Sequence, residues 1–286
     1  LSSAIEKYAN LFGVACGEKN VIFTNNDSAY ETALSLFQKG INIEAIVDNR
    51  EEVDSKLIRE TEKNNIKVYK GYTVVNTFGY KRIKKISIMQ LSKDGQKVVG
   101  PKLSVTCDCL GISGGWTPAV HLFTQSGGKL KFRDEDHVFI PDKYSSDQIS
   151  IGACNGDFTL NEILSTINNK LKEFLNIKET DYKNLDVQSS FNKSKRNIWL
   201  LPSDKVIGKT KSFVDYQNDA TAKDIKLALR EGFRSIEHVK RYTTTGMGTD
   251  QGKLGNMHAL GIISETSDSK MGELGTTTFR PPYTPL

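Results

Sequence analysis

The sequence predicts an α/β fold in two parts, built around a parallel sheet. Three observations carry this prediction. A strand, a helix and a second strand follow one another within residues 20–47, and the next stretch alternates polar and apolar residues as antiparallel strands do. Helices with clear capping signals come later in the chain. The 286 residues suffice for about two domains.

The first strand, helix and strand form the clearest local pattern. Residues 21–24 (VIFT) are an apolar strand, and the helix that follows ends at Gly40, where a C-cap favours a residue that tolerates positive φ. Residues 43–48 are the second strand, and residues 55–65 the next helix. This succession is a βαβ unit, which requires parallel strands.

Strands dominate the middle of the chain. Residues 66–80 and 81–91 alternate as an antiparallel meander does, with a turn at residues 93–95. Residues 104–118 are predicted to be a buried strand that enters a Gly-rich corner. Residues 149–157 are predicted to be a short strand that ends in Gly-Asp.

Helices and connecting segments follow. Thr159 and Glu162 form a capping box for an amphipathic helix over residues 160–175. Residues 176–212 are polar and basic and are interpreted as a connector. Two further helices are predicted, over residues 221–232 and 235–242. From Thr243 onward the chain is rich in Gly, Thr and Pro, and we expect an extended segment.

The composition excludes several classes of protein. The 39 Lys and Arg against 34 Asp and Glu give a charge of +5, which is less basic than a typical nucleic-acid binder of this size. No apolar run approaches the ~20 residues of a membrane span. The four Cys are too few and too unevenly spaced for a disulfide scaffold, so we expect a reducing, cytoplasmic environment.

The first strand-to-helix turn can be compared with the Gly-rich turn of dinucleotide-binding folds. Thr24, Asn26 and Ala29 occupy the three glycine positions, and only Ala29 is compatible. Asp27 places a carboxylate in the first helical turn, where it would repel a phosphate. Asp48 ends the second strand, where an acidic residue would hold a ribose. The residues favour a Rossmann-like half that keeps its fold without binding a nucleotide at this turn.

Two other turns each allow two interpretations. The Gly-Asp turn before residue 159 could bring backbone N–H groups and Asp157 to an anionic or ribose-bearing ligand, or it could only shape the chain. The corner with Gly114, Gly115 and Trp116 could be a companion turn, although a structural corner is the simpler interpretation. No metal-ligand spacing and no arrangement of catalytic residues is present.

Several strings resemble one family. They are TNNDSAYETAL, LGISGGWTPAVHLFTQSGGKL, GACNGDFTL, VDYQNDATAKDIKLALREGFRSIEHVKRYTTTGMGTDQGK and GTTTFRPPYTP. They are similar to the alpha subunit of heterotetrameric sarcosine oxidase, along essentially the whole chain, and they suggest an internal fragment of it. The resemblance implies a Rossmann-like FAD/NAD(P)-binding fold of the disulfide-reductase type, followed by a small helical module.

The resemblance also implies a domain division. It suggests an inserted second Rossmann-like domain, the returning end of the first, NAD-binding domain, a connector, a helical module and a linker towards a folate-binding domain. The corresponding ranges are 1–125, 126–175, 176–212, 213–250 and 251–286. The helical module resembles one that carries a two-iron cluster in related dehydrogenases, but here it has no cysteines and therefore no such cluster.

The site residues implied by the resemblance lie at the Gly-Asp turn. As contacts of NAD it suggests Ala153, Gly156, Asp157, Phe158 and Leu160. FAD, FMN and tetrahydrofolate would bind elsewhere in the holoenzyme, together with its beta, gamma and delta subunits. We expect no catalytic residue, metal ligand, nucleic-acid contact or membrane contact in this chain. The alternatives are the alpha subunit of another amine or amino-acid dehydrogenase complex, or a non-catalytic assembly scaffold.

Overall fold

The computed structural model describes the whole chain except residues 146, 177–186, 188–196, 206–209 and 278–286. The chain divides into two compact units. The first unit comprises residues 1–116 and 190–204, and the second comprises residues 117–189 and 205–286. Most of the predicted connector, residues 176–212, lies outside the described residues.

A parallel sheet organises the first unit. Its strand order is β3-β2-β1-β7, and β1 pairs in parallel with both β2 and β7. The predicted βαβ unit is confirmed, as is the helix after it. The elements are α1 (Ser2–Phe12), β1 (Asn20–Thr24), α2 (Ser28–Gln38), β2 (Ile43–Asp48), α3 (Lys56–Lys63), β3 (Lys67–Lys70) and β7 (Cys109–Ser113).

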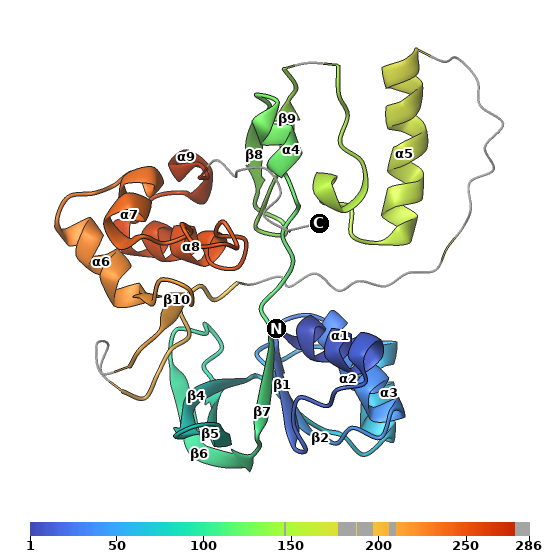
Figure 1. Ribbon diagram of the computed structural model, residues 1–286, viewed down its shortest axis with the longest axis vertical. Coiled ribbons are helices and arrows are strands. Elements are labelled where there is room, and N and C mark those ends of the chain that lie inside the picture. The colour runs from blue at the N-terminus through green and yellow to red at the C-terminus, as the bar shows by residue number, and fades with distance from the viewer. Residues whose placement is uncertain (146, 177–186, 188–196, 206–209, 278–286) are drawn as a thin grey trace. The chain divides into compact units, whose positions relative to one another are not determined.

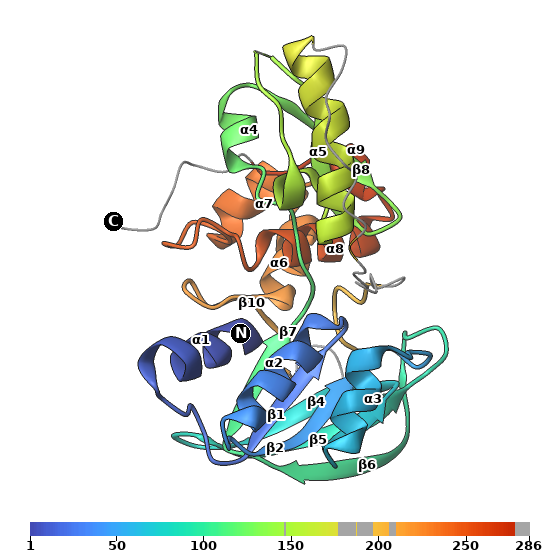
Figure 2. The same cartoon turned by 90° about the vertical axis from the view of Figure 1, so that its right-hand side faces the viewer.

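Both faces of this sheet are covered, which explains why β1 is apolar throughout its middle. Ile22 faces the helices and packs with Tyr30 and Leu36 in one buried cluster. Val21 and Phe23 point the other way, into a second buried cluster. Figures 1 and 2 show α1, α2 and α3 on one side of the sheet and an antiparallel meander on the other.

The meander consists of β4 (Tyr72–Gly79), β5 (Ile83–Leu91) and β6 (Val98–Thr106), paired in that order. Antiparallel pairing in this stretch is confirmed. The predicted start of the meander is wrong, because residues 67–70 form β3 and belong to the parallel sheet. The backbone turns at Gly71, so the chain changes sheets there.

The predicted single strand over residues 104–118 is wrong, because two strands share this stretch. β6 ends at Thr106 and β7 begins at Cys109 in the other sheet. Asp108 lies between them, and its carboxylate accepts hydrogen bonds from the backbone N–H groups of Glu18 (3.1 Å) and Lys19 (2.9 Å). These bonds hold the chain where it leaves the meander.

The second unit begins with a hairpin and a long helix. The elements are α4 (His121–Gln125), the strands β8 (Lys129–Arg133) and β9 (Val138–Lys143), the 3-10 helix η1 (Gly152–Asn155) and α5 (Leu160–Leu175). The predicted helix and its capping box are confirmed. The predicted strand over residues 149–157 is wrong, because hydrogen bonds from Asp157 N to Gly152 O and from Gly156 N to Ala153 O curl the backbone into η1.

A helical module completes the second unit. Its elements are β10 (Phe213–Asp215), β11 (Ala220–Thr221), α6 (Ala222–Arg230), α7 (Ile236–Thr243), α8 (Asn256–Ser267) and α9 (Met271–Leu274). The two predicted helices, α6 and α7, are confirmed. The extended segment predicted after Thr243 is wrong for the described residues, because α8 buries Leu260, Ile262 and Ile263 almost completely. Within the described part of the chain, no helix combines the length and the apolar character that a bilayer span requires.

Candidate functional site

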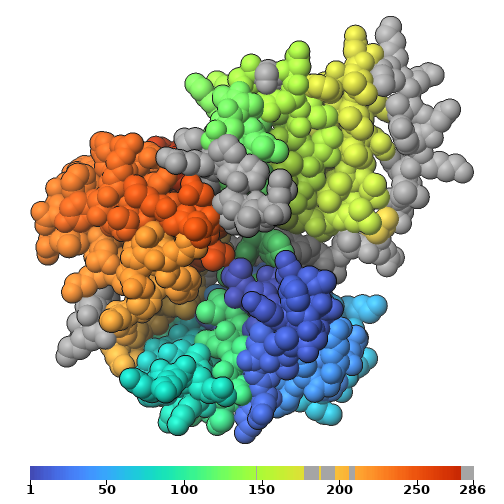
Figure 3. Space-filling model, in the orientation of Figure 1, coloured from blue at the N-terminus to red at the C-terminus, as the bar shows by residue number. Residues whose placement is uncertain are grey.

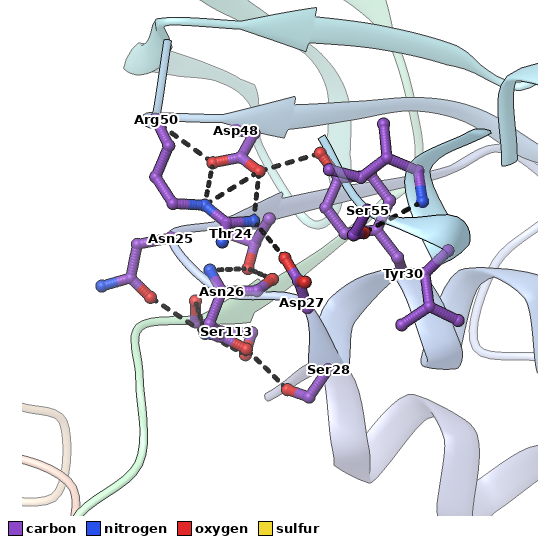
Figure 4. Close-up of polar contacts among 12 residues, drawn as sticks. Thr24, Asn25, Asn26, Asp27, Ser28, Tyr30, Asp48, Arg50, Ser55 and Ser113 are labelled. Carbon is purple, nitrogen blue, oxygen red and sulfur yellow. Dashed lines mark hydrogen bonds and ion pairs between the residues drawn. The ribbon is translucent and has the colours of Figure 1, made fainter. Parts of the chain in front are cut away.

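Polar side chains gather at the carboxyl edge of the parallel sheet, where ligands bind in many doubly wound folds. β1, β2 and β7 end at Thr24, Asp48 and Ser113. Figure 4 shows these residues with the first turn of α2, which contributes Asp27 and Ser28.

An ion cluster fills part of this edge. The Arg50 guanidinium binds both carboxylate oxygens of Asp48, with Nη2 2.7 Å from Oδ2 and Nε 3.0 Å from Oδ1. The same Nη2 lies 2.8 Å from Oδ1 of Asp27, so two carboxylates share one guanidinium. Tyr30 donates its hydroxyl to Asp48 Oδ2 at 2.8 Å. Asp48 and Tyr30 are completely buried, and Asp27 is 2% exposed.

The burial of the cluster alters its protonation. Burial and the neighbouring Asp48 carboxylate raise the pKa of Tyr30, so its hydroxyl stays a hydrogen-bond donor. Burial by itself would lower the pKa of Arg50, but the Asp48 and Asp27 carboxylates outweigh that effect and raise it. Arg50 therefore remains charged and holds the two carboxylates together.

The turn beside the cluster is closed by hydrogen bonds to the Gly-rich corner after β7. Asn26 donates from Nδ2 to the Ser113 hydroxyl at 3.0 Å, and Asn25 donates from Nδ2 to Gly114 O at 3.0 Å. Trp116 donates its indole N–H to the Ser28 hydroxyl at 3.0 Å. These contacts support the interpretation of the corner as a structural one.

The contacts of this turn oppose the binding of a dinucleotide. The backbone N–H of Asn26 is already bonded to Thr24 Oγ1 at 3.0 Å, and that of Asn25 to Ser113 O at 3.3 Å. Asp27 puts a buried carboxylate where a phosphate would need positive charge. Asp48 lies where an acidic residue would contact a ribose, but both of its carboxylate oxygens already accept hydrogen bonds from Arg50 and Tyr30. These contacts give the predicted absence of a nucleotide at this turn a physical reason.

The Gly-Asp turn in the second unit brings all five predicted NAD contacts into one short segment. Gly156 is buried, Asp157 and Phe158 are half-buried, and Ala153 and Leu160 are exposed. Gly156 adopts a φ of 84°. A Cβ there would lie 2.7 Å from Nη2 of Arg133, so this position needs glycine.

Two cations hold the turn in place. Arg133 donates from Nη2 to Gly156 O at 2.9 Å and pairs with the Asp136 carboxylate, and these carboxylate contacts raise the pKa of Arg133. Lys170, on α5, donates to Asn155 Oδ1 at 2.6 Å. Asn155 in turn donates to Oδ2 of Asp157 at 2.9 Å. This bond positions the Asp157 carboxylate, and among the described residues its Oδ1 accepts no hydrogen bond.

The beginning of α5 favours a hydroxyl-bearing ligand over a phosphate. The Glu162 carboxylate accepts hydrogen bonds from the backbone N–H groups of Phe158 (3.1 Å) and Thr159 (3.0 Å). Its negative charge occupies the donors that a phosphate would use. The Asp157 carboxylate, with one oxygen held by Asn155, can still accept a hydrogen bond from a hydroxyl group.

A third polar network lies in the helical module. Asp215, 6% exposed, accepts hydrogen bonds from the backbone N–H groups of Gln217, Asn218 and Gly246, the last at 2.7 Å. Burial alone would raise the pKa of Asp215, but the three N–H groups outweigh it and lower that pKa. Asp215 thus joins the loop after β10 to the loop after α7.

The cations that organise these sites cannot be found from the local sequence pattern. Arg50 and Arg133 belong to no periodic pattern of residues in the sequence. Their roles depend on contacts with Asp27 and Gly156, which only folding brings close. The sequence predicts Lys170 only as one residue of the amphipathic helix over residues 160–175. Among the described residues, no three His, Cys, Asp or Glu side chains come together as metal ligands would.

Comparisons with known proteins find relatives along the whole chain. A family model described as the sarcosine oxidase A3 domain matches residues 209–286. The whole chain is 33% identical over 298 residues to the sarcosine oxidase subunit alpha of Corynebacterium sp. (strain P-1), and it spans 30% of that protein. It is 34% identical to the sarcosine oxidase subunit alpha of Rhizobium meliloti (strain 1021), of which it spans 28%. The chain thus spans less than a third of the length of these relatives.

A solved structure shares the fold. The L-proline dehydrogenase from P. horikoshii matches 98% of this chain with 51% of its own, at a TM-score of 0.57 and 16% identity. The predicted fold class, a Rossmann-like α/β part followed by a helical module, is confirmed.

Proposed function

Because this chain is homologous along its whole length to sarcosine oxidase alpha subunits, we propose that it is a segment of such a subunit. The assembled enzyme would demethylate sarcosine oxidatively, with flavin, NAD and tetrahydrofolate as cofactors and with further subunits of the beta, gamma and delta type. The described chain would supply one wall of the NAD pocket and contacts to other subunits.

The Asp157 carboxylate is the observation that carries this role. One of its oxygens is held by Asn155, and the turn around it is braced by Arg133 and Lys170. Such bracing reduces the cost of ordering a binding group when its ligand arrives. We therefore assign Asp157 as the acceptor of a ribose hydroxyl, with Ala153, Gly156, Phe158 and Leu160 forming the surrounding surface.

NAD, when bound, would supply a nicotinamide ring that accepts or donates a hydride. The residues of this chain would bind and orient it. At the Gly-Asp turn the charged side chains Arg133, Lys170 and Glu162 already take part in structural hydrogen bonds. We assign no catalytic acid, base or nucleophile to them.

The test is the NAD content of the assembled enzyme that carries Asp157→Ala in its full-length subunit. The substitution removes a charged hydrogen-bond acceptor, and such bonds contribute about 1.5–3 kcal/mol. We expect NAD to bind roughly tenfold to a hundredfold more weakly. NAD released from the denatured enzyme can be measured after dialysis against increasing volumes of buffer.

The matched control is Asp134→Ala, which removes the same charge from an exposed turn of the same unit. It should leave the NAD content unchanged. If Asp157→Ala also retains NAD as the wild type does, the assignment of the ribose acceptor is wrong. A wild-type assembly without any NAD would favour the scaffold hypothesis, and turnover of another secondary amine but not of sarcosine would favour a different dehydrogenase complex.

A further inference from the structure

Positive charge is segregated in one stretch of the first unit. Residues 63–93 contain eight Lys or Arg and no Asp or Glu, although the whole chain has 39 basic and 34 acidic residues. Within this stretch, the Lys70 ammonium pairs with the Glu62 carboxylate at 2.9 Å, and the Lys67 ammonium lies over the Tyr69 ring. Four of the others, Lys81, Arg82, Lys84 and Lys85, gather at one end of the β4–β5 hairpin.

We call residues 78–85 the basic tip. β4 ends at Gly79 and β5 begins at Ile83, so the tip is a tight hairpin turn. Gly79 has a φ of 148°, and a Cβ there would clash with the carbonyl oxygen of Arg82. No other residue type allows the two strands to close so tightly at this point.

The tip presents aromatic rings together with its cations. Tyr80 is 96% exposed, and Phe78 is 38% exposed. The Lys85 ammonium lies 4.9 Å from the centroid of the Phe78 ring. Figure 3 shows the meander, coloured teal to green, at the surface of the first unit.

The hairpin that carries the tip is firmly anchored. Ile86 and Ile88 of β5 are completely buried and pack with Val21 and Phe23 of the parallel sheet. The exposed residues therefore project from a strand that has little freedom to move. A rigid, preorganised surface loses less entropy on binding than a loose loop does.

The cations of the tip form no close ion pair within the described part of the chain, although the charge of Arg82 helps to lower the pKa of Asp108. None of Lys81, Arg82, Lys84 and Lys85 forms an ion pair with a described residue. The neighbouring Asp108 already accepts the backbone N–H groups of Glu18 and Lys19 with its two oxygens.

We propose that the basic tip docks onto an acidic surface of another subunit of the same assembly. This inference rests on the proposed function, since it requires a subunit that has partners. Tyr and Arg are the side chains that most often carry the binding energy of protein interfaces, because they bury a large area and also form hydrogen bonds. An acidic partner surface would neutralise the four cations and cover the Tyr80 ring.

Other polyanionic partners fit the tip less well. A nucleic acid requires an extended basic stripe, whereas the rest of this chain has 31 basic residues against 34 acidic ones, since 39 − 8 = 31. A membrane surface would require a broad apolar face, whereas the apolar side chains of the tip are few and partly covered: Phe78 is 38% exposed, and Ile83 is half-buried. A single compact tip with aromatic and cationic side chains matches a protein surface.

The experiment uses the full-length subunit, tagged and co-expressed with its partner subunits. The variant carries Lys81→Glu and Arg82→Glu, and the control carries Lys39→Glu and Lys56→Glu, which reverse two exposed charges at the helical side of the same unit. The association constant is measured from subunit dissociation on dilution, in low and in high salt. We expect the tip variant to associate at least about tenfold more weakly in low salt, and to lose part of the salt dependence of the wild type.

The NAD content and the thermal unfolding of each variant show whether it is folded. A folded tip variant that assembles as tightly as the wild type and the control overturns the docking inference alone. A wild-type subunit that captures no partner overturns both this inference and the proposed function. If assembly is unchanged while binding to a heparin column falls only in the tip variant, the tip belongs to a nucleic-acid contact and the inference is wrong.

Discussion

At the scale of single residues, Arg50 decides the chemistry of the carboxyl edge of the parallel sheet. Its guanidinium holds Asp48 and Asp27 within 2.7 and 2.8 Å. A charged side chain from the protein thus takes the place that a ligand occupies in many related folds. A buried ion cluster of this kind adds little net stability while intact, but removing one partner leaves the others without compensation.

We predict that Asp48→Ala strongly destabilises the protein. The substitution leaves the Tyr30 hydroxyl without its buried acceptor and the Arg50 guanidinium with Asp27 alone, and breaking a buried ion pair costs about 3–5 kcal/mol in comparable cases. The measurement is the free energy of unfolding in urea. Asp54→Ala is the matched control, because the Asp54 side chain is 70% exposed and pairs with Arg59, whose side chain is 60% exposed. The control should change the free energy of unfolding by about 0–1 kcal/mol, and equal losses in both variants would contradict the prediction.

Asp215 predicts a pH dependence of stability. Its pKa is lowered in the folded protein, so it contributes stability above the unfolded value of ~3.9, and this stability is lost as the pH falls through the folded pKa. Asp215→Asn should therefore be less stable than the wild type at neutral pH. The difference should shrink on acidification below pH ~4, as measured by urea unfolding of the helical module at a series of pH values.

Asp219→Asn removes the same charge from an exposed position in the same loop. This control should follow the wild-type profile. If the stability difference between Asp215→Asn and the wild type stays constant across the acid range, the three backbone N–H groups do not stabilise the Asp215 carboxylate as we infer.

At the scale of secondary-structure elements, capping boxes determine where two of the helices begin. The Thr159 hydroxyl accepts the Glu162 N–H at the start of α5, and Thr221 does the same for Asp224 at the start of α6. Each box satisfies backbone N–H groups that would otherwise have no partner within the helix. The capping box at Glu162 has a further effect, because its carboxylate occupies the backbone N–H groups of Phe158 and Thr159 that a phosphate would otherwise bind.

Removal of the α6 cap should have a measurable cost. Thr221→Ala deletes both the hydroxyl that accepts the Asp224 N–H and the 2.7 Å bond that it donates to the Asp224 carboxylate. We expect a loss of about 1 kcal/mol in the stability of the helical module. Hydrogen exchange of the α6 amides reports this loss directly. Ser165→Ala, at an exposed position inside α5, removes a hydroxyl without removing a cap and should leave the exchange of α6 amides unchanged.

At the scale of the whole molecule, each unit has its own buried core. Ile22, Ile46 and Ile58 are completely buried in the first unit. Ile225 and Ile263 are completely buried in the second. Separate cores allow separate cooperative unfolding, as is usual for chains with two domains.

We therefore predict that core substitutions act on one unit at a time. Ile22→Ala should cost about 2–5 kcal/mol and increase hydrogen exchange in the first unit. Ile225→Ala should have the same effect confined to the second unit. Exchange measured by mass spectrometry distinguishes the two cases, and a loss of protection spread equally over both units would show that they unfold as one.

The sequence determined the elements whose signals lie within a few residues of one another. The βαβ unit, α5, α6 and α7 follow from periodicity and from caps such as Thr159 with Glu162, because these interactions span only one or two helical turns. The family resemblance likewise came from the sequence alone, through strings of residues spread along the chain.

Only the tertiary structure decided which segments meet. It assigned residues 67–70 to the parallel sheet, divided residues 104–118 between two sheets at Asp108, and folded α8 from a stretch whose Gly and Thr content suggested an extended chain. It also brought Arg50 to Asp27 and Arg133 to Gly156. Strand pairing and buried ion pairs depend on the register and packing of distant segments, and no local pattern of residues encodes that placement.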